Sequence, residues 1–154
     1  MKDNTGKTAI HRTTISAPLL SFVKNKLIRG SVLDYGCGHG KDLEYLQQFC
    51  IDADGWDPNH RPNMIPLTRK WDTILCTYVL NVLESETDRM FVVEIIKSLL
   101  NPGGNAYITV RNDIKELKGK TEIDTWQGLV TLDLPIIRKN SGYITYHYAK
   151  VNPQ

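Results

Sequence analysis

Long apolar runs are absent from this chain of 154 residues. A helix that crosses a membrane needs about 18 or more consecutive apolar residues, and no stretch of the sequence reaches that length. The stretch from Met1 to Lys7 also lacks the apolar core of a signal peptide. The sequence therefore predicts a cytoplasmic protein with no membrane partner.

Cysteine and histidine are too few and too scattered to form a structural framework. The three cysteines, Cys37, Cys50 and Cys76, are odd in number and widely spaced, which indicates reduced thiols and not a set of disulfides. No two of them have the spacing of metal ligands, so the sequence predicts no metal site. The net charge of +2 is also small, and it neither requires nor excludes a nucleic-acid partner.

We expect a single domain over residues 1–154, with residues 1–15 as a flexible or lid-like segment. Apolar spacing predicts helices over residues 17–28, 41–48 and 85–100. Short apolar runs predict strands over residues 31–35, 53–56, 72–77 and 106–110. Strands that alternate with helices indicate an α/β fold with a doubly wound, Rossmann-like and mainly parallel sheet. Residues 129–134 and 142–148 alternate in polarity, and they predict an antiparallel strand pair at one end of that sheet.

A glycine-rich turn follows the first predicted strand. It reads Asp34-Tyr35-Gly36-Cys37-Gly38-His39-Gly40, and a helical pattern begins at Lys41. Because glycine has no side chain, the backbone of such a turn can approach a ligand closely. In a parallel sheet, the turn and residues 57–59, 77–81 and 111–113 would gather at the edge where ligands bind.

Two common ligands suit this turn poorly. A phosphate loop needs serine or threonine where Asp42 stands, and it needs its first glycine where Tyr35 stands. A dinucleotide fingerprint needs its third glycine one position later than Gly40. Asp34 would also repel a pyrophosphate by a few kcal/mol at about 4–6 Å. A NAD- or nucleotide-binding oxidoreductase is therefore the third choice of function.

A cationic cofactor explains these features better. S-Adenosyl-L-methionine carries a sulfonium and an ammonium group and no phosphate, so an acid before the glycines is compatible with it. Asp57 ends the next predicted strand, and its carboxylate can accept hydrogen bonds from both ribose hydroxyls.

These motifs resemble those of class I S-adenosylmethionine-dependent methyltransferases. The resemblance covers about residues 31–110 and rests on the glycine turn, Trp56-Asp57-Pro58, residues 71–83 (WDTILCTYVLNVL) and residues 99–108 (LLNPGGNAYI). With Thr8-Ala9-Ile10-His11-Arg12 included, the set is similar to methyltransferases associated with DNA phosphorothioation.

The resemblance implies a shortened class I methyltransferase fold that binds S-adenosyl-L-methionine. Asp34 would help to hold the methionine end of the cofactor, Asp57 would take the ribose, and the backbone near Thr77 would approach the ammonium group. Residues 58–71 are too few for the usual helix and strand, so adenine would contact Pro58 and Asn59 instead. The implied cofactor-binding set is Arg12, Asp34, Gly36, Cys37, Gly38, Asp57, Pro58, Asn59, Thr77 and Tyr78.

Four residues near the same edge are catalytic candidates: Tyr78, Asn81, Arg111 and Asp113. Methyl transfer from a sulfonium depends on alignment of the nucleophile, and a base is optional. Each candidate also has a purely structural alternative: Tyr78 as a packed aromatic, Asn81 as a turn cap, and Arg111 with Asp113 as an exposed ion pair.

The sequence does not identify the methyl acceptor, which could be nucleic acid, protein or a small molecule. It lacks the Asn/Asp-Pro-Pro-Tyr element that grips a flipped base, a Pro-Cys nucleophile and an extra recognition domain. A homodimer or a partner protein is left open. His11, Arg12, Trp126 and Gln127 lie in segments that could fold over the site as a lid. The alternative function is a catalytically silent S-adenosylmethionine-binding module, because a shortened domain could keep the cofactor and lose the chemistry.

Overall fold

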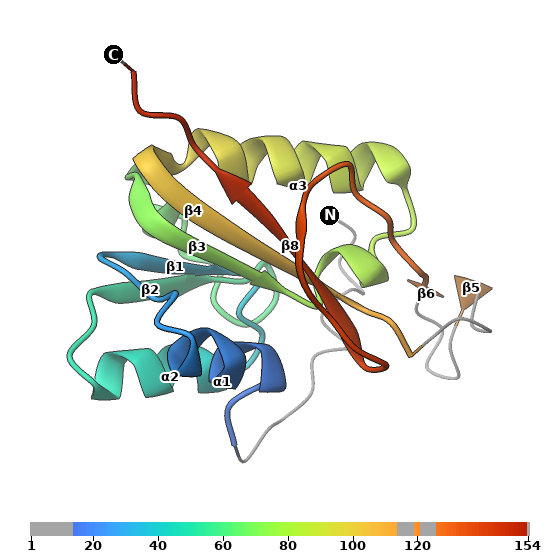
Figure 1. Cartoon of the computed structure of the whole chain (residues 1–154), viewed down its shortest axis with the longest axis horizontal. Helices are drawn as coiled ribbons and strands as arrows, with labels where there is room; N and C mark the ends of the chain where they lie inside the picture. Colours follow the sequence, from blue (N-terminus) through green and yellow to red (C-terminus); the bar gives the residue numbers. More distant parts are fainter. Residues whose placement is uncertain (1–13, 114–118, 121–125, 154) are drawn as a thin grey trace.

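A six-stranded sheet with the order β2-β1-β3-β4-β8-β7 forms the centre of the molecule (Figure 1). The computed structural model describes residues 14–113, 119–120 and 126–153, so the predicted roles of His11 and Arg12 lie outside the described residues. The strands of the sheet are β1 (Val32–Tyr35), β2 (Ala53–Trp56), β3 (Trp71–Thr77), β4 (Leu100–Arg111), β7 (Ile136–Lys139) and β8 (Tyr143–Ala149). Two short strands, β5 (Gly119–Lys120) and β6 (Trp126–Gln127), form a separate antiparallel pair.

The direction of the strands confirms the predicted fold class. β2, β1, β3 and β4 pair in parallel, whereas β8 is antiparallel to both β4 and β7. The carboxyl ends of β1, β2 and β3 therefore lie at one edge of the sheet, which is where ligands bind in folds of this type.

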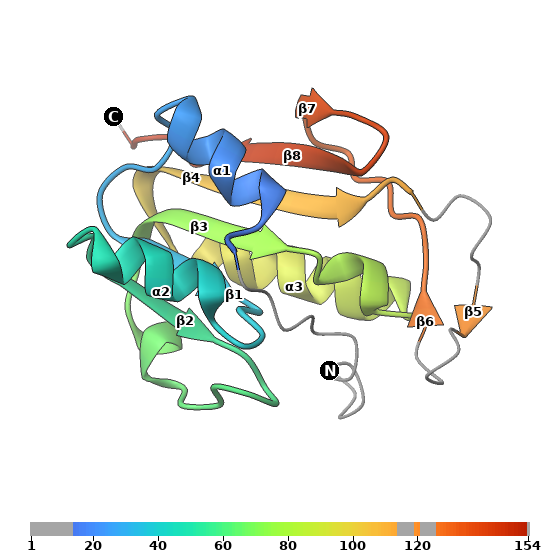
Figure 2. The ribbon, with the colours of Figure 1, turned by 90° about the horizontal axis from the view of Figure 1, so that it is seen from below.

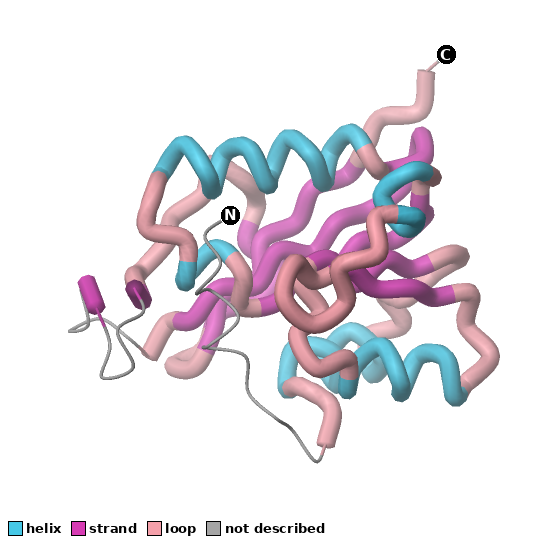
Figure 3. Tube along the Cα trace, turned by 180° about the vertical axis from the view of Figure 1, so that it is seen from behind, coloured by secondary structure: helices cyan, strands magenta, loops and turns pink. Residues whose placement is uncertain are grey.

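Helices cover both faces of the sheet (Figures 2 and 3). On one face, α1 (Ala17–Lys24) and α2 (Lys41–Gln48) share a core cluster with Val32 and Leu75. On the other face, α3 (Glu86–Ser98) shares a cluster with Leu33 and Ile74. Successive strand residues point to opposite faces, so the continuous apolar runs of β1 and β3 bury both sides of the sheet, as parallel strands require.

The helix ends show where local sequence signals hold and where they fail. Ser85 caps α3 by accepting a hydrogen bond from the Asp88 backbone N–H at 3.3 Å, as its sequence pattern indicates. The predicted helix over residues 17–28 is too long, because α1 ends at Lys24 and Lys26 adopts a left-handed conformation with φ of 57°. Leu27 and Ile28 continue the apolar pattern because they pack into the α1–α2 cluster from outside the helix.

The predicted strand over residues 129–134 is wrong. The strand that pairs with β8 is β7, which begins at Ile136. Leu132 and Leu134 are partly buried against the cluster that contains α3. Their alternation therefore reflects packing onto the core and not strand pairing.

β4 is longer than the predicted 106–110, because it also includes the segment Asn101-Pro102-Gly103-Gly104. That segment does stop the preceding helix, which ends at Ser98 and not at residue 100. It joins the sheet because the Gly103 N–H donates to the Lys150 carbonyl, and the Lys150 N–H donates to the Gly104 carbonyl, both at 2.9 Å.

The chain between β2 and β3 is short, as the sequence predicts. The only helical element there is a 3₁₀ turn, η2 (Ile65–Thr68), so β2 is the edge strand of the sheet. A second 3₁₀ turn, η3 (Leu80–Val82), follows β3. Within the described ranges, no helix has the length and apolar character that a membrane crossing demands.

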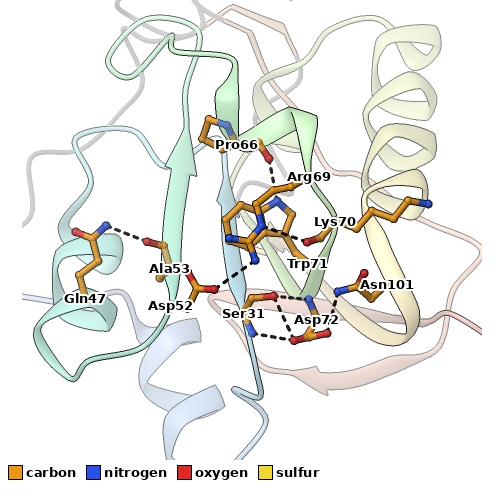
Figure 4. Close-up of polar contacts among 10 residues, drawn as sticks. All are labelled: Ser31, Gln47, Asp52, Ala53, Pro66, Arg69, Lys70, Trp71, Asp72 and Asn101. Carbon is orange, nitrogen blue, oxygen red and sulfur yellow. Dashed lines mark hydrogen bonds and ion pairs between the residues drawn. The ribbon is translucent and has the colours of Figure 1, made fainter.

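Three side chains tie the amino ends of the central strands together, and we call them the amino-end clamp: Ser31, Asp72 and Asn101 (Figure 4). The Asp72 carboxylate accepts hydrogen bonds from the Ser31 N–H at 3.0 Å, the Ser31 hydroxyl at 3.2 Å and the Asn101 amide at 3.0 Å. The bonds from Ser31 and Asn101 hold the pKa of Asp72 below its ordinary value. Gly30 leaves the space for this carboxylate, since a Cβ there would lie 2.2 Å from Asp72 Oδ2.

Candidate functional site

A pocket of about 660 Å³ opens at the carboxyl ends of β1, β2 and β3. Of the residues selected from the sequence, the pocket is lined by Asp34, Gly36, Cys37, Gly38, Asp57, Pro58, Thr77, Tyr78, Asn81, Arg111 and Asp113. Asn59 is not among the lining residues. The convergence of these distant segments follows from the parallel sheet, which brings the carboxyl ends of its strands together.

The glycine turn requires glycine for steric reasons. Gly36, Gly38 and Gly40 all have positive φ values of 55–83°. Residues that carry a side chain adopt this backbone conformation only at an energetic cost. A Cβ at Gly36 would also lie 2.4 Å from a methyl group of Val79. The Gly36 and Cys37 N–H groups donate to the Trp56 carbonyl at 2.7 and 3.1 Å, which joins the turn to the end of β2.

Asp57 is held in place by three backbone donors. Its Oδ2 accepts a hydrogen bond from the Gly38 N–H at 3.0 Å, and its Oδ1 accepts from the Asn59 and His60 N–H groups at 2.9 and 3.0 Å. The residue is only 7% exposed. A carboxylate can accept about four hydrogen bonds, so these contacts leave Asp57 the capacity for about one further donor from the pocket.

Asp34 and Asp57 together give the glycine side of the pocket an acidic character. Asp34 lines the same pocket as Asp57 and is 5% exposed. Burial, reinforced by these two carboxylates and partly opposed by Arg61, raises the pKa of the Cys37 thiol to about 12. Cys37 is therefore a neutral thiol near pH 7 and not a nucleophile. The same field favours a ligand that carries positive charge.

Asn81 is buried in the wall of the pocket, with 1% exposure. Its Nδ2 donates to Gln127 Oε1 at 2.9 Å, and its backbone carbonyl accepts from the Gly128 N–H at 2.9 Å. Its Oδ1 is buried without a hydrogen-bond partner among the described residues. Such groups are uncommon in folded proteins, and they often mark functional positions.

Arg111 and Asp113 form a two-point ion pair beside this wall. The Nε and Nη2 atoms of Arg111 donate to the two carboxylate oxygens of Asp113 at 2.9 and 3.0 Å. These hydrogen bonds raise the pKa of Arg111 and lower that of Asp113, so both groups stay charged and offset each other. Tyr78 lines the pocket nearby, in a left-handed conformation with φ of 61° that is strained for an aromatic residue.

The pocket lining also includes residues whose place in it the sequence does not specify, among them Asn140 and Tyr143. The sequence predicts residues 135–141 only as a connection, and it predicts Gln127, which also lines the pocket, only as part of a lid over the site. Asn140 shapes the turn before β8, because its Oδ1 accepts the Gly142 and Tyr143 N–H groups at 2.8 Å. The Asn-x-Gly pattern is a local signal for this turn, but only the tertiary fold carries it to the pocket.

Comparison with known proteins identifies the type of fold. A family model described as a methyltransferase domain matches residues 9–135. The structure is similar to the 1,6-didemethyltoxoflavin-N1-methyltransferase of Burkholderia thailandensis, with a TM-score of 0.62 and 16% identity over 88% of this chain and 78% of that chain. It is also similar to TehB from Haemophilus influenzae, with a TM-score of 0.63 and 16% identity over 97% of this chain and 67% of that chain.

A third similar structure is the N-methyltransferase NodS from Bradyrhizobium japonicum WM9 in complex with S-adenosyl-L-homocysteine. Its TM-score is 0.53, with 13% identity over 89% of this chain and 85% of that chain. A search of curated proteins gives no match. At these identities the structural likeness concerns the fold.

Proposed function

Since this chain belongs to the methyltransferase-domain family, we propose that it transfers a methyl group from S-adenosyl-L-methionine to an acceptor. The observation that carries the proposal is the pair of buried acids, Asp34 and Asp57, on either side of the glycine turn. A cation suits this pocket and a pyrophosphate does not. The similar NodS structure contains S-adenosyl-L-homocysteine, which supports the same choice of cofactor.

The residues present fit this cofactor. Asp57 would accept a hydrogen bond from a ribose hydroxyl with its remaining capacity, and Asp34 would face the cationic methionine end. The main chain of the glycine turn, including Cys37, would pack against the cofactor. The main chain at Thr77 and Tyr78 would approach the ammonium group. Pro58, which follows the edge strand β2, would contact the adenine. Asn59 would contribute through the N–H that holds Asp57.

The remaining lining residues would position the acceptor. We call Tyr78, Asn81, Arg111, Asp113, Gln127 and Tyr143 the acceptor half of the pocket. When bound, the cofactor supplies an already activated methyl group on a cationic sulfur. The chain must then exclude water and align the nucleophile, and alignment of this kind can contribute about 7–11 kcal/mol. Asp113, held by Arg111 through both carboxylate oxygens, would act with it as a fixed polar pair that orients the acceptor.

Calorimetry tests the cofactor. The folded protein should bind S-adenosyl-L-methionine and S-adenosyl-L-homocysteine and should not bind NAD or ATP. Failure to bind either methionine derivative would remove this proposal. Binding of NAD instead would favour an oxidoreductase.

Transfer of a labelled methyl group tests the chemistry. The protein is incubated with methyl-labelled S-adenosyl-L-methionine and, separately, with nucleic acid, protein and small-molecule fractions of a lysate. Label in one fraction identifies the acceptor class. Cofactor binding with no transfer to any fraction would support a silent binding module. The structural argument for such a module is that β2 is the edge strand of the described sheet, so the domain is shortened on that side.

A further inference from the structure

The acceptor half of the pocket carries no unbalanced charge among its described residues. Its two charged groups, Arg111 and Asp113, are joined by two hydrogen bonds of 2.9 and 3.0 Å. The other members are amides and phenols. A carboxylate or phosphate on the acceptor would therefore find no spare cation within this half. Lys41, which also lines the pocket, lies outside this half, with its Nζ 3.8 Å from Glu44 Oε2. An anion on the acceptor would also face Asp34 and Asp57. Burying an unpaired anion is strongly unfavourable.

Asn81 and Gln127 form the most deeply buried polar pair of this half. Both residues are buried, and one amide donates to the other at 2.9 Å. Asn81 Oδ1 nevertheless has no partner among the described residues. A buried acceptor left without a donor destabilises the folded protein, so this oxygen is a feature that folding alone does not explain.

Neighbouring residues hold Asn81 and Gln127 in place, so the unpaired oxygen does not result from a poorly packed side chain. The Gly128 N–H donates to the Asn81 carbonyl at 2.9 Å. Trp126, next to Gln127, lies against Arg89, whose guanidinium carbon is 5.5 Å from the ring centroid. Arg89 in turn donates to the carbonyls of Leu83 and Glu84 at 2.6 and 3.0 Å, just after η3.

We propose that Asn81 Oδ1 accepts a hydrogen bond from an N–H group of the methyl acceptor, and that the acceptor is a small, neutral nitrogen compound such as an amide or a lactam. This inference rests on the proposed function. The oxygen is shielded from solvent, so a donor reaches it when a neighbouring lining side chain rotates, a common adjustment on binding. Binding then supplies the hydrogen bond that the protein itself lacks.

Three related probes test the inference on protein saturated with S-adenosyl-L-homocysteine: benzamide, N,N-dimethylbenzamide and benzoate. Affinities are measured by NMR titration. Benzamide should bind about 3- to 10-fold more tightly than its dimethyl form, the range expected for one hydrogen bond, and benzoate should bind more weakly than benzamide. A second pair, 2-pyridone and N-methyl-2-pyridone, should show the same preference for the N–H form.

The variant Asn81→Leu should lose this preference and should keep its affinity for S-adenosyl-L-homocysteine within twofold. Asn81→Ala serves the same purpose if the leucine variant does not fold. Asn105→Leu is the matched control, because Asn105 contacts His147 at 2.8 Å and does not line the pocket. It should keep the preference.

Three outcomes would overturn the inference: equal binding of the N–H and N-methyl forms to the unmodified protein, tighter binding of benzoate, or a preference that persists without the Asn81 amide. Tighter binding of benzoate would mean that Arg111 leaves Asp113 for an anion. If S-adenosyl-L-homocysteine does not bind, the proposed function itself fails. If it binds and no N–H preference exists, only the present inference fails.

Discussion

The two ends of the sheet both carry buried or half-buried carboxylates, and they use them differently. At the amino end, Asp72 accepts hydrogen bonds from Ser31 and Asn101 and joins three strands. At the carboxyl end, Asp57 is held by backbone N–H groups and keeps some capacity to accept a further donor.

The ends also differ in their unpaired polar groups. The two buried side-chain polar atoms without a partner among the described residues, Trp56 Nε1 and Asn81 Oδ1, both belong to segments at the carboxyl end. A chain tolerates such defects mainly where a ligand binds or a reaction occurs. We therefore expect the amino end to serve stability and the carboxyl end to serve binding.

The glycines at the two ends give the strongest test of this contrast. Gly36→Ala and Gly30→Ala should each lower the free energy of unfolding by about 2–5 kcal/mol, because both combine a positive φ with a clash. Urea unfolding measures this loss. Only Gly36→Ala should also weaken binding of S-adenosyl-L-homocysteine, by at least tenfold in the folded fraction. Unchanged binding in that variant would contradict a ligand role for the turn.

The carboxylates separate the ends more cleanly. Asp57→Ala should weaken binding of S-adenosyl-L-homocysteine by about 1.5–3 kcal/mol, the range for a hydrogen bond to a charged group. Asp72→Ala is the matched control, and it should lower stability by about 1–3 kcal/mol with affinity unchanged. Calorimetry and urea unfolding on both variants give the four values. An Asp57 variant with the affinity of the unmodified protein would show that Asp57 does not hold the ribose.

Acid should act on the amino-end clamp. Because hydrogen bonds lower the pKa of Asp72 in the folded protein from its ordinary value of 3.8, Asp72 stabilises the fold at pH values above about 4. That contribution is lost as the pH falls through the folded pKa. Urea midpoints between pH 6 and pH 3 should therefore fall less steeply for Asp72→Asn than for the unmodified protein. Parallel curves would contradict the assignment.

A smaller effect on stability is expected at Arg69. Its guanidinium carbon is 3.9 Å from the Trp71 ring centroid, and its Nη2 is 3.3 Å from an Asp52 oxygen. Both partners of the ion pair are largely exposed, and pairs of this kind contribute little. Arg69→Ala should lower the free energy of unfolding by about 1 kcal/mol or less. Affinity for S-adenosyl-L-homocysteine should not change. A larger effect on binding than on stability would break the division between the two ends.

The sequence predicted those parts of the site that depend on local chemistry. The glycine turn and Asp57 lie directly after strands, and their backbone contacts involve neighbours in the chain or the adjacent strand. Gln127 and Tyr143 could not be placed in the same way. Their position in the pocket depends on the pairing of β8 with β4 and on the contact of β6 with Asn81.

The errors in the fold have one physical origin. The apolar spacing of residues 25–28 and 129–134 predicts regular structure, whereas Ile28 and Leu134 pack onto a core without it. Apolar spacing reports burial, and backbone hydrogen bonds decide whether a buried segment is a helix, a strand or neither.

The place of β8 has a consequence for how the molecule is made. β8 lies between β4 and β7 and is the last strand along the described residues. During synthesis, β4 would therefore present an unpaired edge until residue 149 has left the ribosome, and exposed edges of this kind promote association with other chains. Removal of β8 would leave the acids and the glycine turn intact in sequence, but it would make the product prone to aggregation.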